Sequence, residues 1–156
     1  MKAVKVSEIK KDLTSKTQPE LLHLCLHLAK FKKENKELLT YLLFEADDEA
    51  SFIQSIKEEV DEQFSEINTS SYYFIKKSMR KILRNIKKHI RYSKNKETEV
   101  ELLIYYCSKL NSFSPSITRS TALVNLYQRQ LVSIRKTVSS LHEDLQYDFG
   151  LQIEEL

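Results

Sequence analysis

Glycine and proline are nearly absent from this chain of 156 residues, which has one glycine, Gly150, and two prolines, Pro19 and Pro115. Soluble proteins average about 7% glycine and 5% proline. Glycine-rich phosphate loops and the glycine-flanked serine of a nucleophile elbow are therefore excluded. Short β-hairpin turns, which usually need glycine, are disfavoured too. The composition excludes nucleotide chemistry on those scaffolds and favours an all-helical chain.

Cysteine pairs and long apolar runs are also missing. Cys25 and Cys107 form no Cys-x-x-Cys motif, which excludes a zinc ribbon or a redox pair, and we expect both as small buried hydrophobic residues. The most apolar run, residues 38–44, is far shorter than the about 20 residues of a membrane helix, so no membrane span is predicted. With no secretory segment near Lys2 and Lys5, we expect a cytoplasmic protein.

Apolar residues recur at helical spacing through most of the chain, which predicts an all-α fold. We expect a single domain of six to seven helices, arranged as an irregular helical bundle or a HEAT-like α-α superhelix. Helix starts are predicted at Ser7, at the capping box Thr17–Glu20 and at Asp47–Glu49. The expected parts are N-terminal helices (1–46), an acidic/basic helical hairpin (47–96), C-terminal helices (97–150) and a tail (151–156).

The last helix is expected to run from about Thr118 to Phe149, with Gly150 just past its end. A seam with 3-4 spacing follows it. Its members are Val124, Tyr127, Leu131, Ile134, Val138, Leu141 and Leu145. The part from 131 to 145 is narrow, as is typical of packing against one other helix. That helix belongs either to the same chain or, in a homodimer through 131–145, to a second copy.

Charge is distributed unevenly, although the net charge is only +3. Residues 34–66 hold eleven acidic and two basic residues, residues 67–96 hold ten basic residues and no acidic one, and residues 143–156 hold five acidic residues alone. The basic block falls on a predicted helix over 72–93 whose other side is apolar. Basic amphipathic helices bind phosphate backbones, anionic membrane surfaces or acidic partners. The candidate binding residues are Lys77, Arg80, Lys81, Arg84, Lys87, Lys88 and Arg91.

The preceding helix supplies an alternative explanation, because it carries Glu58, Glu59, Asp61, Glu62 and Glu66. Two consecutive helices joined by a short loop normally pack antiparallel. The favoured interpretation is that these carboxylates cover the stripe formed by Arg80, Arg84, Lys87 and Arg91. An exposed stripe would instead be a binding site for a polyanion or an acidic partner, or a plain solvated face.

No pattern of catalytic or metal-ligating residues emerges. Glu20, His23 and His27 resemble half of a di-iron site, but no second Glu-x-x-His follows, and His142 begins no His-Glu-x-x-His motif. We therefore expect no catalytic residue, no metal and no cofactor. The aromatic clusters 72–74 and 105–106 are expected in the core and at its rim, because neighbouring helical residues point about 100° apart and form no base-stacking platform.

The first 45 residues or so form a helix-loop-helix pattern with the segments Val6–Leu13, Gln18–Leu22 and Leu26–Leu28. On these residues the N-terminus resembles small all-helical bacterial proteins of uncharacterised function. This resemblance implies an all-α fold in the bacterial cytoplasm. It transfers no functional residue.

The sequence as a whole predicts a non-enzymatic helical protein-interaction module with an acidic partner. The alternative is nucleic-acid binding through the basic helix 72–93.

Overall fold

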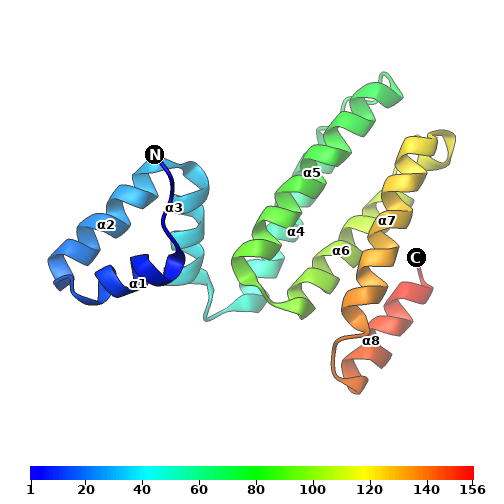
Figure 1. Ribbon diagram of the computed structural model, residues 1–156. Coiled ribbons are helices and arrows are strands. Elements are labelled where there is room, and N and C mark those ends of the chain that lie inside the picture. The colour runs from blue at the N-terminus through cyan, green and yellow to red at the C-terminus, as the bar shows by residue number, and fades with distance from the viewer. The chain divides into compact units, whose positions relative to one another are not determined.

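The computed structural model describes all 156 residues and is helical throughout, with eight α-helices and no strand (Figure 1). This confirms the all-α prediction and corrects the expected number of six to seven helices. None of the helices is long and apolar enough to cross a membrane. The chain divides into two compact units, residues 1–44 (unit 1) and 45–156 (unit 2).

Unit 1 consists of α1 (Val6–Thr14), α2 (Gln18–Phe31) and α3 (Lys33–Thr40). A single π-helical turn, Tyr41–Glu45, follows at its end. The predicted capping box is confirmed: the Thr17 N–H donates to Glu20 Oε2 at 2.8 Å, and the Glu20 N–H donates to Thr17 Oγ1 at 3.4 Å. The predicted cap at Ser7 is wrong, because Ser7 lies inside α1 and the helix begins after Lys5 without a side-chain cap.

No side chain of α1, α2 or α3 is buried. α2 packs against α3, but three short helices in this arrangement enclose no core. Cys25 is consequently exposed, which corrects its expected burial. The apolar residues of these helices have the spacing predicted from the sequence, but no neighbouring helix of unit 1 covers them completely.

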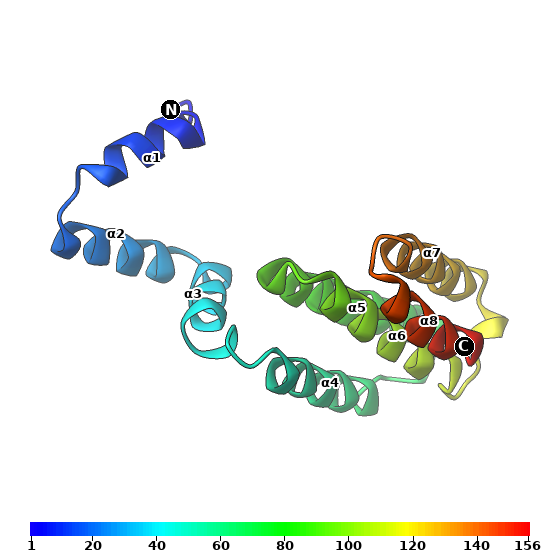
Figure 2. The ribbon, with the colours of Figure 1, turned by 90° about the horizontal axis from the view of Figure 1, so that it is seen from below.

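Unit 2 consists of α4 (Glu49–Ser65), α5 (Tyr72–Ser93), α6 (Lys96–Asn111), the 3₁₀ turn Ile117–Arg119, α7 (Thr121–Val138) and α8 (Glu143–Glu154). α6 contacts each of the other four helices (Figure 2). At 100° per residue, its buried residues cover about two thirds of the helix circumference, a wide apolar surface that suits a central helix. Cys107 lies among them, as predicted, and burial raises the pKa of its thiol to about 12.

Buried polar groups hold the α4–α6 part of unit 2 together. The fully buried Tyr106 donates its hydroxyl to the carbonyl of Met79 on α5 at 2.9 Å. Glu49, at the start of α4, accepts hydrogen bonds from Ser93 and Thr98 on either side of the α5–α6 connection. The predicted cap of α4 is also present, since Asp48 accepts from the Ser51 N–H at 3.1 Å. The bonds made by Tyr106 and Glu49 tie α5 to α6 and α4.

The predicted single last helix is wrong. α7 ends at Val138, and α8 starts again at Glu143. Ser139 and Ser140 each donate their hydroxyl to the carbonyl three residues earlier at 2.7 Å, and His142 caps α8 by accepting from the Asp144 N–H at 3.4 Å. Serine hydroxyls that bond locally compete with helix continuation, so the chain turns here without glycine or proline.

Because the chain turns between α7 and α8, the predicted seam and the predicted tail lie differently from what the sequence suggested. Ile134 and Val138 are buried inside unit 2, so this part of the seam packs within the chain. Gly150 lies inside α8 and does not follow the last helix, and the expected tail is helical as far as Glu154.

Candidate interaction surface on helix α5

α5 is amphipathic along its whole length. Its inner side buries Ile75, Met79, Ile82, Leu83 and Ile86. We call its outer side the basic face, defined by the seven residues Lys77, Arg80, Lys81, Arg84, Lys87, Lys88 and Arg91. All of them are exposed except Lys88, which is half-buried. At 1.5 Å per residue, the basic face spans about 21 Å.

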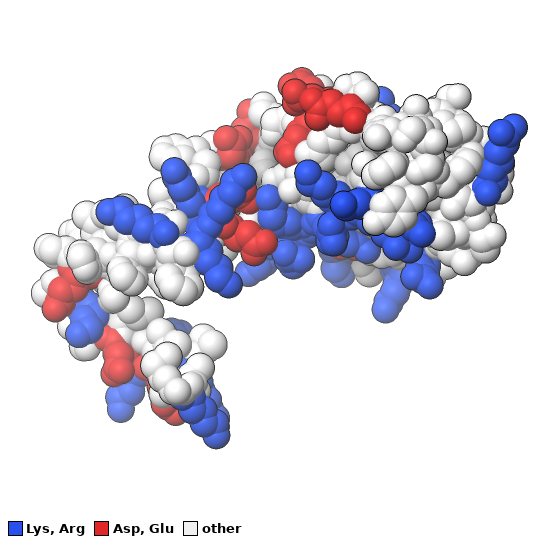
Figure 3. Space-filling model, turned by 90° about the horizontal axis from the view of Figure 1, so that it is seen from above, with Lys and Arg blue, Asp and Glu red and all other residues white.

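Basic and acidic side chains lie on different sides of unit 2. Lys and Arg gather mostly on the side where α5 runs, and Asp and Glu cluster on another side (Figure 3). Arg80, Arg84, Lys87 and Arg91 form no ion pair with any carboxylate of the chain. The prediction that the acidic helix covers this stripe is therefore wrong. α4 and α5 pack through their apolar sides, which turns their charged sides away from each other.

The carboxylates of α4 find other partners. Asp61 accepts hydrogen bonds at 2.6 Å from the Tyr105 hydroxyl and from Lys109 Nζ, both on α6. These two bonds hold the pKa of the Asp61 carboxyl below its usual range. Glu59 accepts from the neutral amide of Asn85 on α5 at 2.6 Å. Acidic charge on α4 is thus balanced partly by α6 and leaves the α5 stripe uncompensated.

The α4–α6 contact also contains a second ion pair, in which the basic residue lies on α4 and the acidic residue on α6. Lys57 on α4 pairs with Glu101 on α6 at 2.6 Å. Lys57 and Lys109 lie 5.4 and 5.5 Å from the centre of the Tyr105 ring. Burial and the Asp61 carboxylate raise the pKa of Tyr105 to about 12. These polar side chains of α4 and α6 are paired with one another, which fits a structural role.

The first turn of α5 adds an aromatic end to the basic face. Tyr73 and Phe74 are 63% and 42% exposed, and their rings meet edge to face at 5.4 Å. Tyr73 lies four residues before Lys77 and continues the line of the stripe. The sequence reasoning missed this extension, although the 4-3-4-3-4 spacing of positions 73, 77, 80, 84, 87 and 91 is a signal that could have found it. Tyr72, by contrast, donates to the Ser116 carbonyl at 2.8 Å and is part of the packing.

The other residues considered from the sequence do not assemble into a site. No three side chains of the metal-ligating types come together anywhere in the chain. Glu20 is engaged in the capping box, where hydrogen bonds from the backbone and side chain of Thr17 lower its pKa. His23 and His27 lie exposed on α2.

Comparisons with known protein families, with curated proteins and with solved structures found no match to this chain.

Proposed function

We propose that this chain is a non-enzymatic helical interaction module that binds an acidic partner protein through the basic face of α5. One observation carries the proposal: exposed basic side chains stand in line on a firmly packed helix, and no carboxylate of the chain pairs with the Arg80, Arg84, Lys87 and Arg91 stripe. Like charges held this close repel one another, and a partner of opposite charge relieves that repulsion.

The geometry of the basic face favours a helical acidic partner. Arg80, Arg84, Lys87 and Arg91 step by four, three and four residues, so they form one straight row. A helix with carboxylates at matching spacing presents a complementary row. Arginine guanidinium groups bind carboxylates through two parallel hydrogen bonds, which adds specificity to the charge attraction.

Nucleic-acid binding through helix 72–93 is the second candidate, and the exposed Tyr73 favours it. A base stacked on that ring would leave its phosphates beside Lys77 and Arg80. α5 is packed along its length against α4 and α6, so we do not expect it to enter a major groove as a recognition helix does. Any such binding would follow the phosphate backbone and would show little sequence preference.

The test compares two labelled probes, a poly-glutamate peptide and a DNA duplex, by fluorescence anisotropy at physiological salt. The variant Arg80→Glu/Arg84→Glu reverses two charges within the row. The matched control Arg129→Glu/Arg135→Glu makes the same charge change at exposed positions on α7. We expect the peptide to bind the parent and the control, and the row variant to lose binding.

The salt dependence separates the two candidates. If four phosphates are neutralised, log K for the duplex falls with log salt at a slope of about −3.6. Tighter binding of the duplex than of the peptide, with this slope, would favour the second candidate. Binding of neither probe at low salt would show that both proposals are wrong.

For the architecture of unit 2 we propose a HEAT-like stack. Each of its helices packs against the next one in sequence, and α6 in addition contacts α4 and α8. Such an arrangement is typical of stacked helix pairs, in which one set of helices forms an extended outer surface. The cytoplasm is the compartment we propose, with support from the two free thiols, Cys25 and Cys107.

A further inference from the structure

Unit 1 exposes an unusual amount of apolar surface. Of the eighteen large hydrophobic side chains that are exposed in the chain, thirteen lie in its first 44 residues. α2 is apolar on several sides, with Leu22 61%, Leu26 46% and Leu28 58% exposed. A helix that is apolar nearly all round is normally buried, and large exposed apolar patches mark interaction sites.

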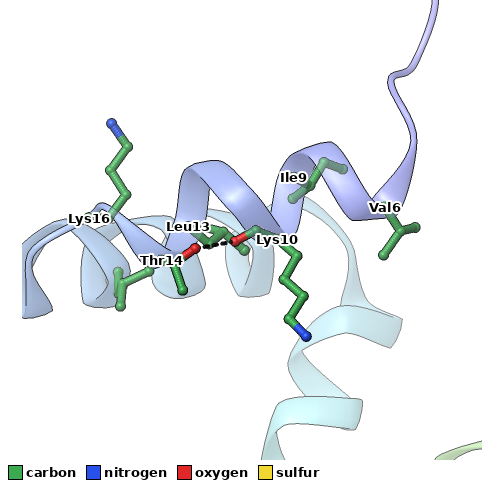
Figure 4. A pocket seen from close by; sticks show the side chains of 7 residues that line it. Val6, Ile9, Lys10, Leu13, Thr14 and Lys16 are labelled. Atoms are coloured by element: carbon green, nitrogen blue, oxygen red, sulfur yellow. Dashed lines mark hydrogen bonds between the residues drawn. The ribbon is translucent and has the colours of Figure 1, made fainter.

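A shallow, open groove lies along α1 beside the start of α2, within this surface. It has a volume of about 500 Å³ and is lined by the apolar side chains of Val6, Ile9, Leu13 and Leu21. Lys10 and Lys16 also line it, and in Figure 4 their side chains extend from the ribbon in opposite directions. The unit as a whole has nine lysines against five acidic residues. The groove therefore suits an apolar ligand with acidic flanks.

The outer face of α8 combines apolar side chains with acidic ones beside them. Tyr147 and Leu151 lie four residues apart and are 69% and 49% exposed. At 100° per residue, the five acidic residues of this segment fall on the same side of the helix as these two side chains. They are Glu143, Asp144, Asp148, Glu154 and Glu155, and all are exposed. α8 buries Phe149 on its opposite side, so its outer face is available without unfolding unit 2.

We propose that α8 of one copy of this chain docks into the α1–α2 groove of a second copy. Tyr147 and Leu151 fill the apolar floor, and the carboxylates beside them pair with Lys10 and Lys16. This is helix-in-groove recognition, in which residues at i and i+4 act as anchors. A stable interface buries about 800 Å² on each partner, and the exposed side chains around the groove supply apolar surface for it. This self-association uses surfaces separate from the basic face of α5.

The experiment measures the mass of the full-length chain by sedimentation velocity. The groove variant is Ile9→Asp/Leu13→Asp, and the face variant is Tyr147→Ser/Leu151→Ser. All four positions are exposed, so the changes leave the buried residues intact. Val132→Asp, at a 68% exposed apolar position on α7, is the control. We expect self-association of the parent and the control, and a loss of about a hundredfold in the association constant for each variant.

Mixing the two variants gives the decisive result. The groove variant keeps its α8 face and the face variant keeps its groove, so the mixture retains one intact contact and is expected to form a one-to-one heterodimer. Restored association is also expected when Lys10→Glu/Lys16→Glu and Asp144→Lys/Asp148→Lys are combined in one chain, after each pair alone has weakened it.

Three results would overturn the proposal. The first is a parent chain that stays monomeric at low salt, and the second is a variant mixture in which no heterodimer forms. The third is binding of the monomer through unit 1 to vesicles of anionic phospholipid, with no self-association in solution.

Discussion

Tyr106 shows what a single buried hydroxyl contributes to unit 2. Its ring is fully buried, and its hydroxyl joins α6 to the Met79 carbonyl on α5. Burial raises the pKa of this phenol, so the group stays neutral. We expect Tyr106→Phe to lower the free energy of unfolding by about 1 kcal/mol, the usual value of one such hydrogen bond. Urea denaturation measures the change, and Tyr73→Phe, at an exposed ring, should leave stability unaltered.

Asp61 makes stability depend on pH. Its pKa is lowered in the folded state by hydrogen bonds from Lys109 and Tyr105. A carboxyl with a depressed folded pKa contributes stability above its unfolded pKa of about 3.9, and that contribution is lost as the pH falls through the folded value. The side chain is about half exposed, so solvent screens the effect. We expect Asp61→Asn to destabilise the protein at neutral pH and to have less effect under strongly acidic conditions, as followed by thermal melts.

Among the helices, α7 offers the cleanest comparison of a buried and an exposed position. Ile134 is fully buried, whereas Val132, two residues earlier, is 68% exposed. Ile134→Asp buries an unpaired charge and should lower the free energy of unfolding by at least about 3 kcal/mol. Val132→Asp should change it by less than about 0.5 kcal/mol. Equal melting temperatures for the two variants would contradict the burial of Ile134.

The individual helices were predictable where local chemistry and apolar spacing agree. The capping box at Thr17 and the cap at Asp48 are both present. The break between α7 and α8 was not predictable in the same way, because Val138, Leu141 and Leu145 keep the 3-4 spacing across it. Local serine hydrogen bonds and the packing of α8 against α6 and α7 decide the turn.

On the scale of the molecule, unit 1 and unit 2 differ in how well their backbones are protected. α6 buries eight side chains, and α1 to α3 bury none. Opening free energies follow buried contacts, so amide hydrogens of α1 to α3 should exchange much faster than those of Val100–Leu110 in dilute protein. Hydrogen exchange by mass spectrometry measures this. Protection of α1 to α3 as strong as that of α6 in the monomer would contradict the absence of a core in unit 1.

The basic face itself was predictable from the sequence, since its seven residues follow from helical spacing alone. Whether anything covers it was not. Oppositely charged neighbouring helices favour a covered face, and only the packing of α4 and α5 through their apolar sides shows that the Arg80, Arg84, Lys87 and Arg91 stripe pairs with no carboxylate of the chain. Likewise, the apolar residues of unit 1 have the spacing of core residues, and only the structure shows that they are exposed.

Binding of an acidic ligand to the basic face of α5 can be mapped residue by residue. Backbone amide shifts of the ¹⁵N-labelled full-length chain are followed during titration with a poly-glutamate peptide at physiological salt. Binding through the basic face predicts that the shifts concentrate between Lys77 and Arg91 on α5, that they saturate, and that they vanish in Arg80→Glu/Arg84→Glu. Shifts centred on unit 1 or on α7, or no shifts at all, would contradict it.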